Sequence, residues 1–424
     1  MNLLNQKPGK GPGSGSTAVI FRHGKKSLPA GSGRGAPWFL CAVTAWASLV
    51  LCASAPARTI SGTVTGNQYG SEISSGDVTG DLDLSGARVT VIGDLIGGLT
   101  HDGKAVGSSV LSSGDTRQIS ITGSVTGGLG ANGAESNVVD LHGGHILGQQ
   151  IGAGTRVEGG VTEAGKAVGN RVTLTGIVLL RGDNIVTGGR TGSGEATGNA
   201  VTMTSSGVLG KVYGSYTGEG LADGAVNLNA SRVTDSVYGG YSENGQADGT
   251  VTITGQYNGH SFDGNVYGGF SEKNGSASGT VNLNGAVLSQ SVYGGYAADG
   301  ASDGTVSISV NSETGDLSTV AGSVYGGYSA AGQAGGTDES TRTTVTLTGS
   351  SVTGDVYGGY SGGGAVQHGD RIGKQHSRRQ PLWRPWNGRR FLQYSESEPC
   401  FSHGRNIWRL HGFRRCFKQH GFPL

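Results

Sequence analysis

Two groups of residues in this chain are of types that bind metal ions or move protons. His142 and His145 form a close pair, and Asp223, Asp248 and Asp303 recur in glycine-rich stretches. A zinc site needs three or four protein ligands, and no third ligand accompanies the two histidines in the sequence. A nonapeptide Gly-Gly-x-Gly-x-Asp array, which binds calcium, is absent as well. We therefore expect the aspartates to keep the surface soluble and the histidines to be solvated.

The C-terminal tail holds a further set of histidines and cysteines. Their spacing fits no C-x-x-C or H-x-x-x-H zinc pattern. The glycine-rich segments elsewhere lack the Lys-Ser/Thr that completes a phosphate-binding loop. We predict that the chain is not an enzyme and has no catalytic residue, metal site or cofactor. The tail residues considered and set aside are His368, His376, His403, Cys400 and Cys416.

One five-residue sequence, Val-Tyr-Gly-(Gly/Ser)-(Tyr/Phe), occurs six times, and we call it the tyrosine word. The first tyrosines of successive copies lie 25, 29, 26, 32 and 32 residues apart. Such a period is typical of stacked units, each of which buries its apolar face only against a neighbour. Weaker copies upstream predict a solenoid that begins near Ile60. The six copies are residues 212–216, 237–241, 266–270, 292–296, 324–328 and 356–360.

A second phrase, of the type Thr-Val-Thr-Ile-Thr, occurs between the tyrosine words. Strict alternation places Val and Ile or Leu on one face of a strand and Thr, Asn or Ser on the other. The copies are residues 250–254, 280–284, 305–309 and 344–348. Each repeat thus supplies a half-buried strand, and the fold class that we predict is all-β, a repetitive parallel β-helix or β-solenoid.

The small residues between these phrases predict the connections. Stretches such as residues 245–249 (Gly-Gln-Ala-Asp-Gly) are expected to be turns. The Gly-Gly of each tyrosine word is expected to form a bend, with positive φ or close approach of the next coil. Stacked at about 4.8 Å, the tyrosines of successive coils are expected to form an aromatic ladder for packing rather than ligand binding. The variable spacing predicts insertions in loops on one side of the stack.

Composition divides the chain into three segments. All nine prolines, all five tryptophans and all four cysteines lie outside residues 58–365. The formal net charge of +1 combines +6 over residues 1–57, −14 over residues 58–365 (13 basic and 27 acidic residues) and +9 over residues 366–424. A proline-free segment suits continuous strand ladders, because proline deletes a ladder hydrogen bond. The acidic middle argues against nucleic acid as a partner.

Residues 1–57 have the pattern of a secretory signal peptide with an extended basic region. A basic cluster precedes a mostly apolar stretch at 37–52, and Ala55 and Ala57 mark a small-residue cleavage site. A single membrane anchor is the weaker alternative, because about 20 apolar residues are needed to span a bilayer. We expect export, with Arg58 as the new N-terminus and a disordered leader before it.

Residues 366–424 are predicted to be a basic, disordered tail that reads as the same repeat in another frame. Tryptophan has a single codon, TGG, so reading one base later turns Trp-Arg into a codon that begins with GG and encodes glycine. The stretches at 382–385 and 407–410 then recover Tyr-Gly-Gly, at intervals of 25 and 25 residues after Tyr357. We infer a frameshift near residues 361–367; a nucleic-acid-binding basic tail is the alternative.

Taken together, the signal peptide and the Gly-, Thr-, Asn- and Val-rich repeats with Tyr-Gly-Gly words resemble the passenger region of a Gram-negative autotransporter. The resemblance covers roughly residues 38–365. It implies a parallel β-helix displayed outside the cell, commonly in adhesion or host contact. It also implies the export machinery and a C-terminal β-barrel translocator as partners, yet no series of about ten-residue amphipathic strands follows the repeats. Periplasmic retention or degradation is the expectation for a chain truncated in this way, unless a separate pore exists.

The function expected from this resemblance is attachment to a host surface, matrix or glycan through many weak contacts. A structural surface spacer without a receptor is the first alternative. A polysaccharide-degrading β-helix enzyme is the second, disfavoured because the basic residues of the repeats are scattered singly. The Thr-x-Thr faces resemble ice-binding solenoids, but the irregular spacing of 25 to 32 residues and the Asn and Ser replacements predict no flat lattice.

Overall fold

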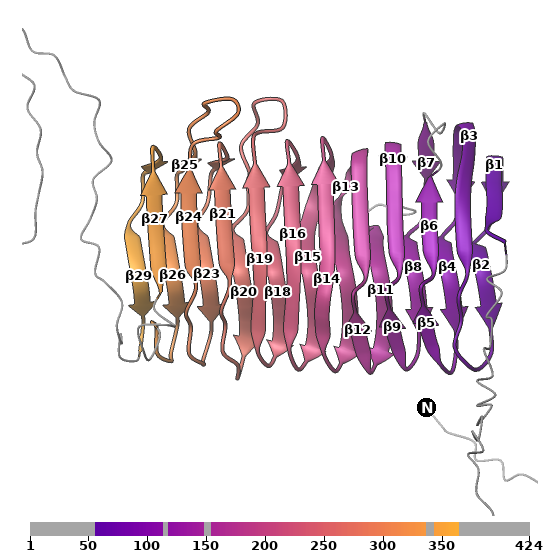
Figure 1. Ribbon diagram of the computed structural model, residues 1–424, viewed down its shortest axis with the longest axis horizontal. Helices are drawn as coiled ribbons and strands as arrows, with labels where there is room; N and C mark the ends of the chain where they lie inside the picture. The colour runs from indigo at the N-terminus through magenta and orange to yellow at the C-terminus, as the bar shows by residue number, and fades with distance from the viewer. Residues whose placement is uncertain (1–55, 113–117, 148–153, 336–342, 364–424) are drawn as a thin grey trace, which may run out of the picture. The chain divides into compact units, whose positions relative to one another are not determined.

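The computed structural model describes residues 56–112, 118–147, 154–335 and 343–363. In these residues every regular element is a β-strand, and every pairing between the strands is parallel. The strands stack into a solenoid of about 10 turns, which Figure 1 shows from the side. The predicted fold class and the start near Ile60 are confirmed, since β1 (Arg58–Thr65) opens the stack. The predicted tail and nearly all of the predicted leader lie outside the described residues.

Each turn of the solenoid contributes strands to three faces. The first, the tyrosine face, carries the tyrosine words and their upstream counterparts. The strands of this face pair in chain order along the stack. Only the C-terminal part of β13 belongs to the face, where it pairs with β11 and β15. They are β2 (Gln68–Ile73), β4 (Leu95–Thr100), β8 (Val125–Gly130), β11 (Arg156–Ala164), β13 (Arg171–Ser193), β15 (Gly207–Glu219), β18 (Val237–Asn244), β20 (Val266–Lys273), β23 (Val292–Ala297), β26 (Val324–Ser329) and β29 (Val356–Ser361).

The second face, the threonine face, carries the alternating phrases. It also includes the beginning of β13, and β1 pairs with its first strand. Its strands are β3 (Asp81–Ile92), β5 (Lys104–Val106), β6 (Ser109–Ser112), β9 (Gly133–Glu135), β10 (Val138–Ile146), β12 (Lys166–Val168), β14 (Ala196–Thr204), β16 (Ala222–Asn229), β19 (Ala247–Thr254), β21 (Thr280–Asn284), β24 (Thr305–Ser309) and β27 (Thr344–Thr348).

The third face is narrow and is made by the shortest strands. It is completed by the ends of β3 and β10, by the middle of β13 and by the start of β15. Its own strands are β7 (Ile119–Ile121), β17 (Arg232–Val233), β22 (Val287–Leu288), β25 (Thr319–Val320) and β28 (Ser351–Val352).

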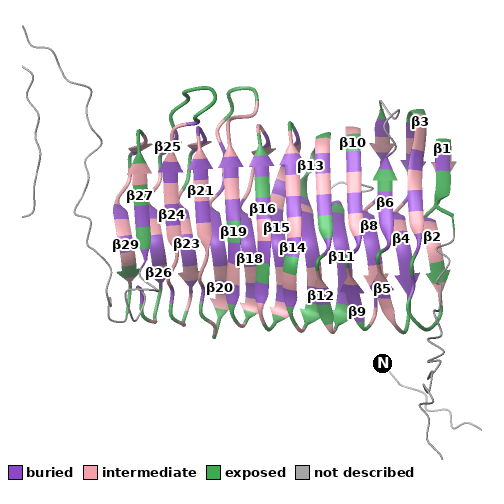
Figure 2. Cartoon of the chain, viewed as in Figure 1, coloured by how far each residue is buried: buried purple, intermediate pink, exposed green. Residues whose placement is uncertain are grey.

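Alternation of side chains fills the inside of this three-walled tube with aliphatic residues. One continuous core runs from Ile60 to Val356. In a typical turn it takes the valine of the tyrosine word, such as Val237, and both apolar residues of the alternating phrase, such as Val251 and Ile253. Figure 2 shows the resulting succession of buried and exposed stripes along the strands. Because each turn covers the core of its neighbours, the stack is stabilised by repetition.

The Gly-Gly of the tyrosine word does not form the predicted bend. Gly239 and Gly240 lie inside β18, and neither has a positive φ. A Cβ on Gly239 would lie 2.4 Å from the carbonyl oxygen of Gly268 and 2.6 Å from the amide nitrogen of Thr250. The prediction of close approach is therefore right, whereas the bend is wrong: the two glycines let opposite walls of the tube meet backbone to backbone.

The predicted turn at residues 245–249 is only partly correct. Gly245 has φ of +154° and lies at the corner, but β19 begins at Ala247 and includes Asp248 and Gly249. Ala247 pairs in register with Ala222 of the preceding turn, and Asp248 pairs with Asp223. The small residues thus belong to the threonine face, because the walls there are too close for larger side chains.

Differences in repeat length are absorbed at corners. The two described insertions, residues 255–261 and 310–318, both lie between the threonine face and the third face (Figure 1). The ladder itself is unshifted: Thr250 pairs with Thr280, which pairs with Thr305, which pairs with Thr344. The expected placement of insertions on one side is confirmed for these two loops. The irregular spacing of the repeats therefore leaves the pairing register of the threonine face unchanged.

Candidate binding surface

The tyrosine words build two parallel aromatic ladders on the outside of the tyrosine face. The first rings of successive words stack with centroids 4.9 to 5.2 Å apart and planes within 11° of parallel. The second rings stack at 4.8 to 5.2 Å. The inner ladder is Tyr213, Tyr238, Tyr267, Tyr293, Tyr325 and Tyr357; the outer ladder is Tyr216, Tyr241, Phe270, Tyr296, Tyr328 and Tyr360.

The two ladders touch each other edge to face. Within one word, Tyr238 and Tyr241 have centroids 5.2 Å apart and planes at 83°. Tyr238 and Tyr241 are three residues apart, and side chains at that spacing in a regular strand point to opposite faces. Both rings point outward here because Gly239 is bulged out of the strand pairing. One ladder was predicted from the sequence, and it is confirmed; the second was missed. The outer ladder could have been predicted from the second aromatic residue of every word, if one of the two glycines had been taken as a β-bulge.

Ring stacking determines what this surface offers to a ligand. The faces of internal rings such as Tyr267 are covered by the neighbouring rings above and below, and only 8% of Tyr267 is exposed. Little of an internal ring is therefore accessible to a ligand. Tyr360, in the last described turn, is 37% exposed. Stacking on a sugar or a cation requires a free ring face, so the ladders are mainly packing elements.

Burial raises the pKa of several phenols of the ladders. It raises the pKa of Tyr238 to about 12 and the pKa of Tyr293 to about 12. The pKa of Tyr216 is raised first by burial and then by its hydrogen bond to a carboxylate. Tyr216 donates to Glu243, and Tyr241 donates to Glu272. Because each acceptor belongs to the next turn, these bonds tie successive turns together outside the core.

A partly buried ion pair lies where the ladders begin. Arg190 is the in-register neighbour of Tyr216, the first ring of the outer ladder. Its Nε lies 2.7 Å from Oε1 of Glu158, whose side chain is 5% exposed. Arg156 adds a second contact to the same carboxylate at 3.6 Å. The cationic group thus closes the N-terminal end of the aromatic stack and is held there by the glutamate.

The threonine face carries a second repeated surface, which we call the threonine array. It consists of the outward side chains of the last five residues of β14, β16, β19, β21, β24 and β27, all exposed or half-exposed. None of them is charged or aromatic. They are Ala200, Thr202, Thr204; Ala225, Asn227, Asn229; Thr250, Thr252, Thr254; Thr280, Asn282, Asn284; Thr305, Ser307, Ser309; and Thr344, Thr346, Thr348.

The three aspartates considered at the outset lie along one edge of this array. Asp223 pairs in register with Asp248, and the backbone nitrogen of Asp303 bonds to Ala277, next to Ser278 in the intervening turn. The pKa of Asp248 is raised, first by burial and then by the charges of Asp223 and Asp303. Oδ1 of Asp248 is buried without a hydrogen-bond partner. The aspartates form a column of acceptors rather than a metal cage.

The two histidines are close in sequence but do not converge on a site. Nε2 of His142 lies 3.0 Å from Oδ1 of Asp140, and both His142 and His145 are exposed on β10. Among the residues that the structure describes, no group of three or more His, Cys, Asp or Glu could hold a metal ion. The histidines and cysteines of the tail lie outside those residues. In the same described ranges, no helix is long and apolar enough to cross a membrane.

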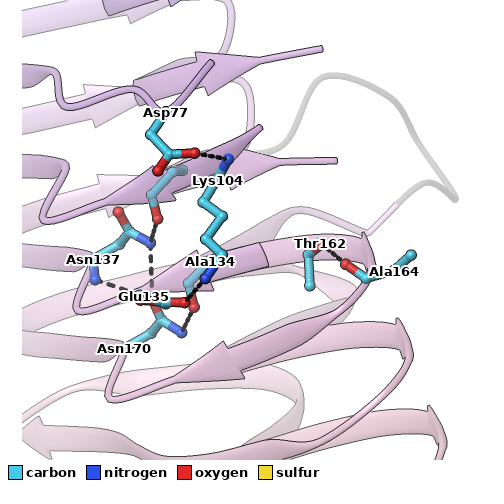
Figure 3. Close-up of polar contacts among 9 residues, drawn as sticks. Asp77, Lys104, Ala134, Glu135, Asn137, Thr162, Ala164 and Asn170 are labelled. Carbon is cyan, nitrogen blue, oxygen red and sulfur yellow. Dashed lines mark hydrogen bonds and ion pairs between the residues drawn. The ribbon is translucent and has the colours of Figure 1, made fainter. Parts of the chain in front are cut away.

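The most extensive polar network is inside the N-terminal turns, and the sequence prediction missed it. Asn137, Asn170 and Asn199 stack in the interior at 0%, 0% and 1% exposure. Each amide donates to the next: Nδ2 of Asn137 lies 2.9 Å from Oδ1 of Asn170, and Nδ2 of Asn170 lies 2.9 Å from Oδ1 of Asn199. Figure 3 shows the first of these bonds. We call this the asparagine ladder.

Both ends of the asparagine ladder are satisfied by serines. Ser108 donates its backbone N–H to Asn137 and accepts from Gly80 through its hydroxyl. At the other end Nδ2 of Asn199 donates to the hydroxyl of Ser215, which donates to the carbonyl of Asp223. Ser215 is the only serine at the fourth position of a tyrosine word. The serine at this position and the recurrence of Asn were the sequence features from which the asparagine ladder could have been predicted.

Comparison with known proteins yields no relatives on which to draw. No family model matches the chain, and neither the curated proteins nor the solved structures contain a significant match. The β-solenoid and its repeated outward surfaces are therefore the basis for the functional argument.

Proposed function

We propose that this chain is an exported passenger of the autotransporter type, displayed at the cell surface, and that it attaches the cell to host matrix or glycans. The signal-peptide pattern of residues 1–57 supports export. The observation that carries the proposal is the unshifted register from Thr250 to Thr344, which repeats one set of side chains turn after turn. A repeated surface binds a repeated ligand with an avidity that exceeds the affinity of one contact.

The proposal is tested by binding of the purified full chain to cultured host cells and to extracellular matrix. Saturable retention is the expected result, and the chain unfolded by denaturant and diluted into the same assay is the control. Export is tested separately by placing residues 1–57 in front of a reporter enzyme and assaying the cell fractions. A reporter that stays in the cytoplasm contradicts export, and a folded chain that no surface retains contradicts attachment.

A structural spacer without a receptor is the second candidate, and one observation favours it. The ring faces of the aromatic ladders are covered by stacking within the chain, as for Tyr267 between Tyr238 and Tyr293. Such ladders stiffen a rod without requiring a partner. A spacer is expected to show no retention on any host surface, which separates it from the adhesive function in the same assay.

A further inference from the structure

The threonine array is distinguished from the rest of the surface by its lack of charge. Residues 58–365 carry 27 acidic and 13 basic residues, yet none of the outward positions of the array holds one. Acids of the same turns lie outside it: Asp223 and Asp248 precede the array on β16 and β19. Glu243 and Glu272 follow tyrosine words. The array is therefore an uncharged patch of the threonine face that is bordered on one side by the aspartate column.

Its side chains also repeat in two directions. Along the stack, Thr252 is followed in register by Asn282, Ser307 and Thr346, at the strand spacing of about 4.8 Å. Across the stack, alternate residues of one strand lie about 6.6 Å apart. The side chains of Ser309 and Asn284 are joined by a hydrogen bond of 2.7 Å. The array is a regular grid of hydroxyl-, amide- and methyl-bearing side chains in register.

Chemistry narrows the ligand that fits this grid. Hydroxyl and amide side chains both donate and accept hydrogen bonds, so they match a ligand that carries many hydroxyls. The acceptor column of Asp223, Asp248 and Asp303 along one edge repels anionic polymers, such as sulfated or uronic-acid chains. An ice surface requires the same group at every point, whereas Asn282 and Ser307 interrupt the threonines.

We propose that the threonine array is the binding surface of this protein and that its ligand is an extended, uncharged polysaccharide lying along the stack. This inference rests on the proposed attachment function and assigns it a surface and a ligand class. Successive sugar units contact equivalent side chains of successive turns. Affinity comes from the number of turns engaged rather than from one deep pocket.

The test is co-sedimentation of the full chain with insoluble uncharged polysaccharides, namely cellulose, chitin and β-1,3-glucan particles. The array variant is Thr252→Lys with Ser307→Lys, which inserts two charges into the middle row. The matched control is Gln290→Lys with Gln333→Lys, at exposed positions away from the array. We expect the native chain and the control to sediment with at least one of the particles. The array variant is expected to lose binding by at least tenfold.

Two further measurements keep the outcome decisive. If the lysines disturb folding, as judged by circular dichroism, Thr252→Val with Ser307→Ala removes the hydroxyls at similar volume and is expected to weaken binding severalfold. Binding is expected to persist in about 1 M salt, where charges are screened beyond about 3 Å. Loss of binding in salt would instead identify a cationic amino-sugar polymer and overturn the proposal.

The remaining outcomes separate this inference from the function on which it rests. Equal binding by the array variant and the control overturns the assignment of the surface. Retention on host cells without sedimentation by any uncharged polysaccharide overturns the ligand class but leaves attachment standing. Inhibition of ice recrystallisation without sedimentation also overturns it, in favour of ice. Absence of binding to cells, matrix and particles alike overturns attachment itself.

Discussion

The N-terminal and C-terminal turns of this solenoid share one backbone path but hold their walls together differently. In the N-terminal turns an amide side chain lies between the walls: a Cβ on Gly189 would lie 2.3 Å from Oδ1 of Asn199. In the C-terminal turns the register replaces Asn199 by Gly224 and then by Gly249. There a Cβ on Gly240 would lie 1.8 Å from the carbonyl of Asp248, so the two backbones meet directly.

The outside of the tyrosine face changes at the same turn. From β4 to β13 its outward positions are aliphatic, polar or charged, as at Leu129 and Arg190. From Tyr213 onward they are aromatic. Turns that lack the buried asparagine ladder thus carry the aromatic ladders on their outer surface. The comparison teaches that a single fold can be stabilised between turns either by buried amides or by surface rings.

The sharpest way to break the N-terminal half is Asn170→Ala. It leaves the side-chain amide and backbone N–H of Asn137 and the carbonyl of Ala134 without their partner. We expect the free energy of unfolding of these turns to fall by about 3–5 kcal/mol, because buried polar groups without partners are costly. Hydrogen exchange of the amides of β10 and β13 measures it.

Thr173→Ala, which changes a half-exposed side chain of the same strand, is the control for Asn170→Ala. It is expected to stay within about 0.5 kcal/mol of the native chain. A loss below about 1 kcal/mol for Asn170→Ala would mean that the asparagine ladder is not what holds the N-terminal walls.

Gly249→Asn tests whether the ladder residue can be restored in the C-terminal half. A Cβ at this position would lie 2.4 Å from the amide nitrogen of Gly240 and 2.5 Å from the carbonyl carbon of Gly239. We expect destabilisation by about 3 kcal/mol or more, because backbone cannot yield as a side chain can. The denaturant midpoint of the C-terminal turns measures this loss.

The matched control for that variant is Gly255→Asn. Gly255 has φ of +69° and nothing within 4 Å of an added Cβ. Asparagine tolerates this left-handed conformation, so a change below about 1 kcal/mol is expected. Equal effects of the two variants would show that the walls are not in contact at Gly249.

Tyr267→Leu removes one ring from the middle of the inner ladder. The ring stacks on Tyr238 at 5.0 Å and on Tyr293 at 4.9 Å, and it meets the edge of Phe270 at 5.0 Å. With aromatic pairs contributing about 0.5–1.5 kcal/mol each, a loss of about 2–3 kcal/mol is expected. The near-ultraviolet circular dichroism of the stacked tyrosines should fall with it.

Tyr267→Phe keeps the stack and is expected to remain within about 0.5 kcal/mol of the native chain. Hydrogen exchange in the N-terminal turns should be the same in both variants, because each turn contacts only its neighbours. Faster exchange at β10 in Tyr267→Leu would show that the two halves are not independent.

The smallest expected effect concerns the aspartate column and pH. Burial, Asp223 and Asp303 raise the pKa of Asp248. A carboxyl group whose folded pKa is raised destabilises the fold when it is ionised, and this loss disappears as pH falls below the ordinary value of about 3.9. Asp248→Asn is therefore expected to stabilise the C-terminal turns at pH 7, by under about 1 kcal/mol since the group is half-exposed.

Denaturant unfolding at pH 7, 5 and 3.5 measures the difference between Asp248→Asn and the native chain. The groups that face Asp248 are Gln246, Asp223, Asp303 and the backbone N–H of Ser278. The difference should shrink steadily toward pH 3.5. A difference that is the same at all three pH values would rule out repulsion within the column.

Much of the fold could be predicted because the same sequence pattern recurs in each repeat. Val and Ile alternate with Thr in every phrase, and this alternation assigned both the core and the outward face correctly. The positions of the bends were less predictable. Gly-Gly and Ala-Asp-Gly are typical of turns, yet here they lie in strands. Small residues are required at these positions because two walls of the tube are in contact there, and not because the chain changes direction.

The candidate surfaces were partly predictable in the same way. One aromatic ladder followed from the recurrence of Tyr at a fixed place in the word. The second ladder required knowledge of the bulge at Gly239, which restores the outward direction of Tyr241. The asparagine ladder could not be inferred from Asn137, Asn170 and Asn199 alone, since asparagine is usually found at the surface or in turns.

The sequence by itself determined the class of structure, the composition of the core and the existence of a repeating aromatic element, because local alternation and period act within one turn. Only the tertiary structure decided which walls touch, where insertions leave the stack, and that the side chains of the threonine array lie in unbroken register. These properties depend on how one turn sits on the next. They arise from parallel hydrogen bonding between residues about one turn apart, which no single repeat contains.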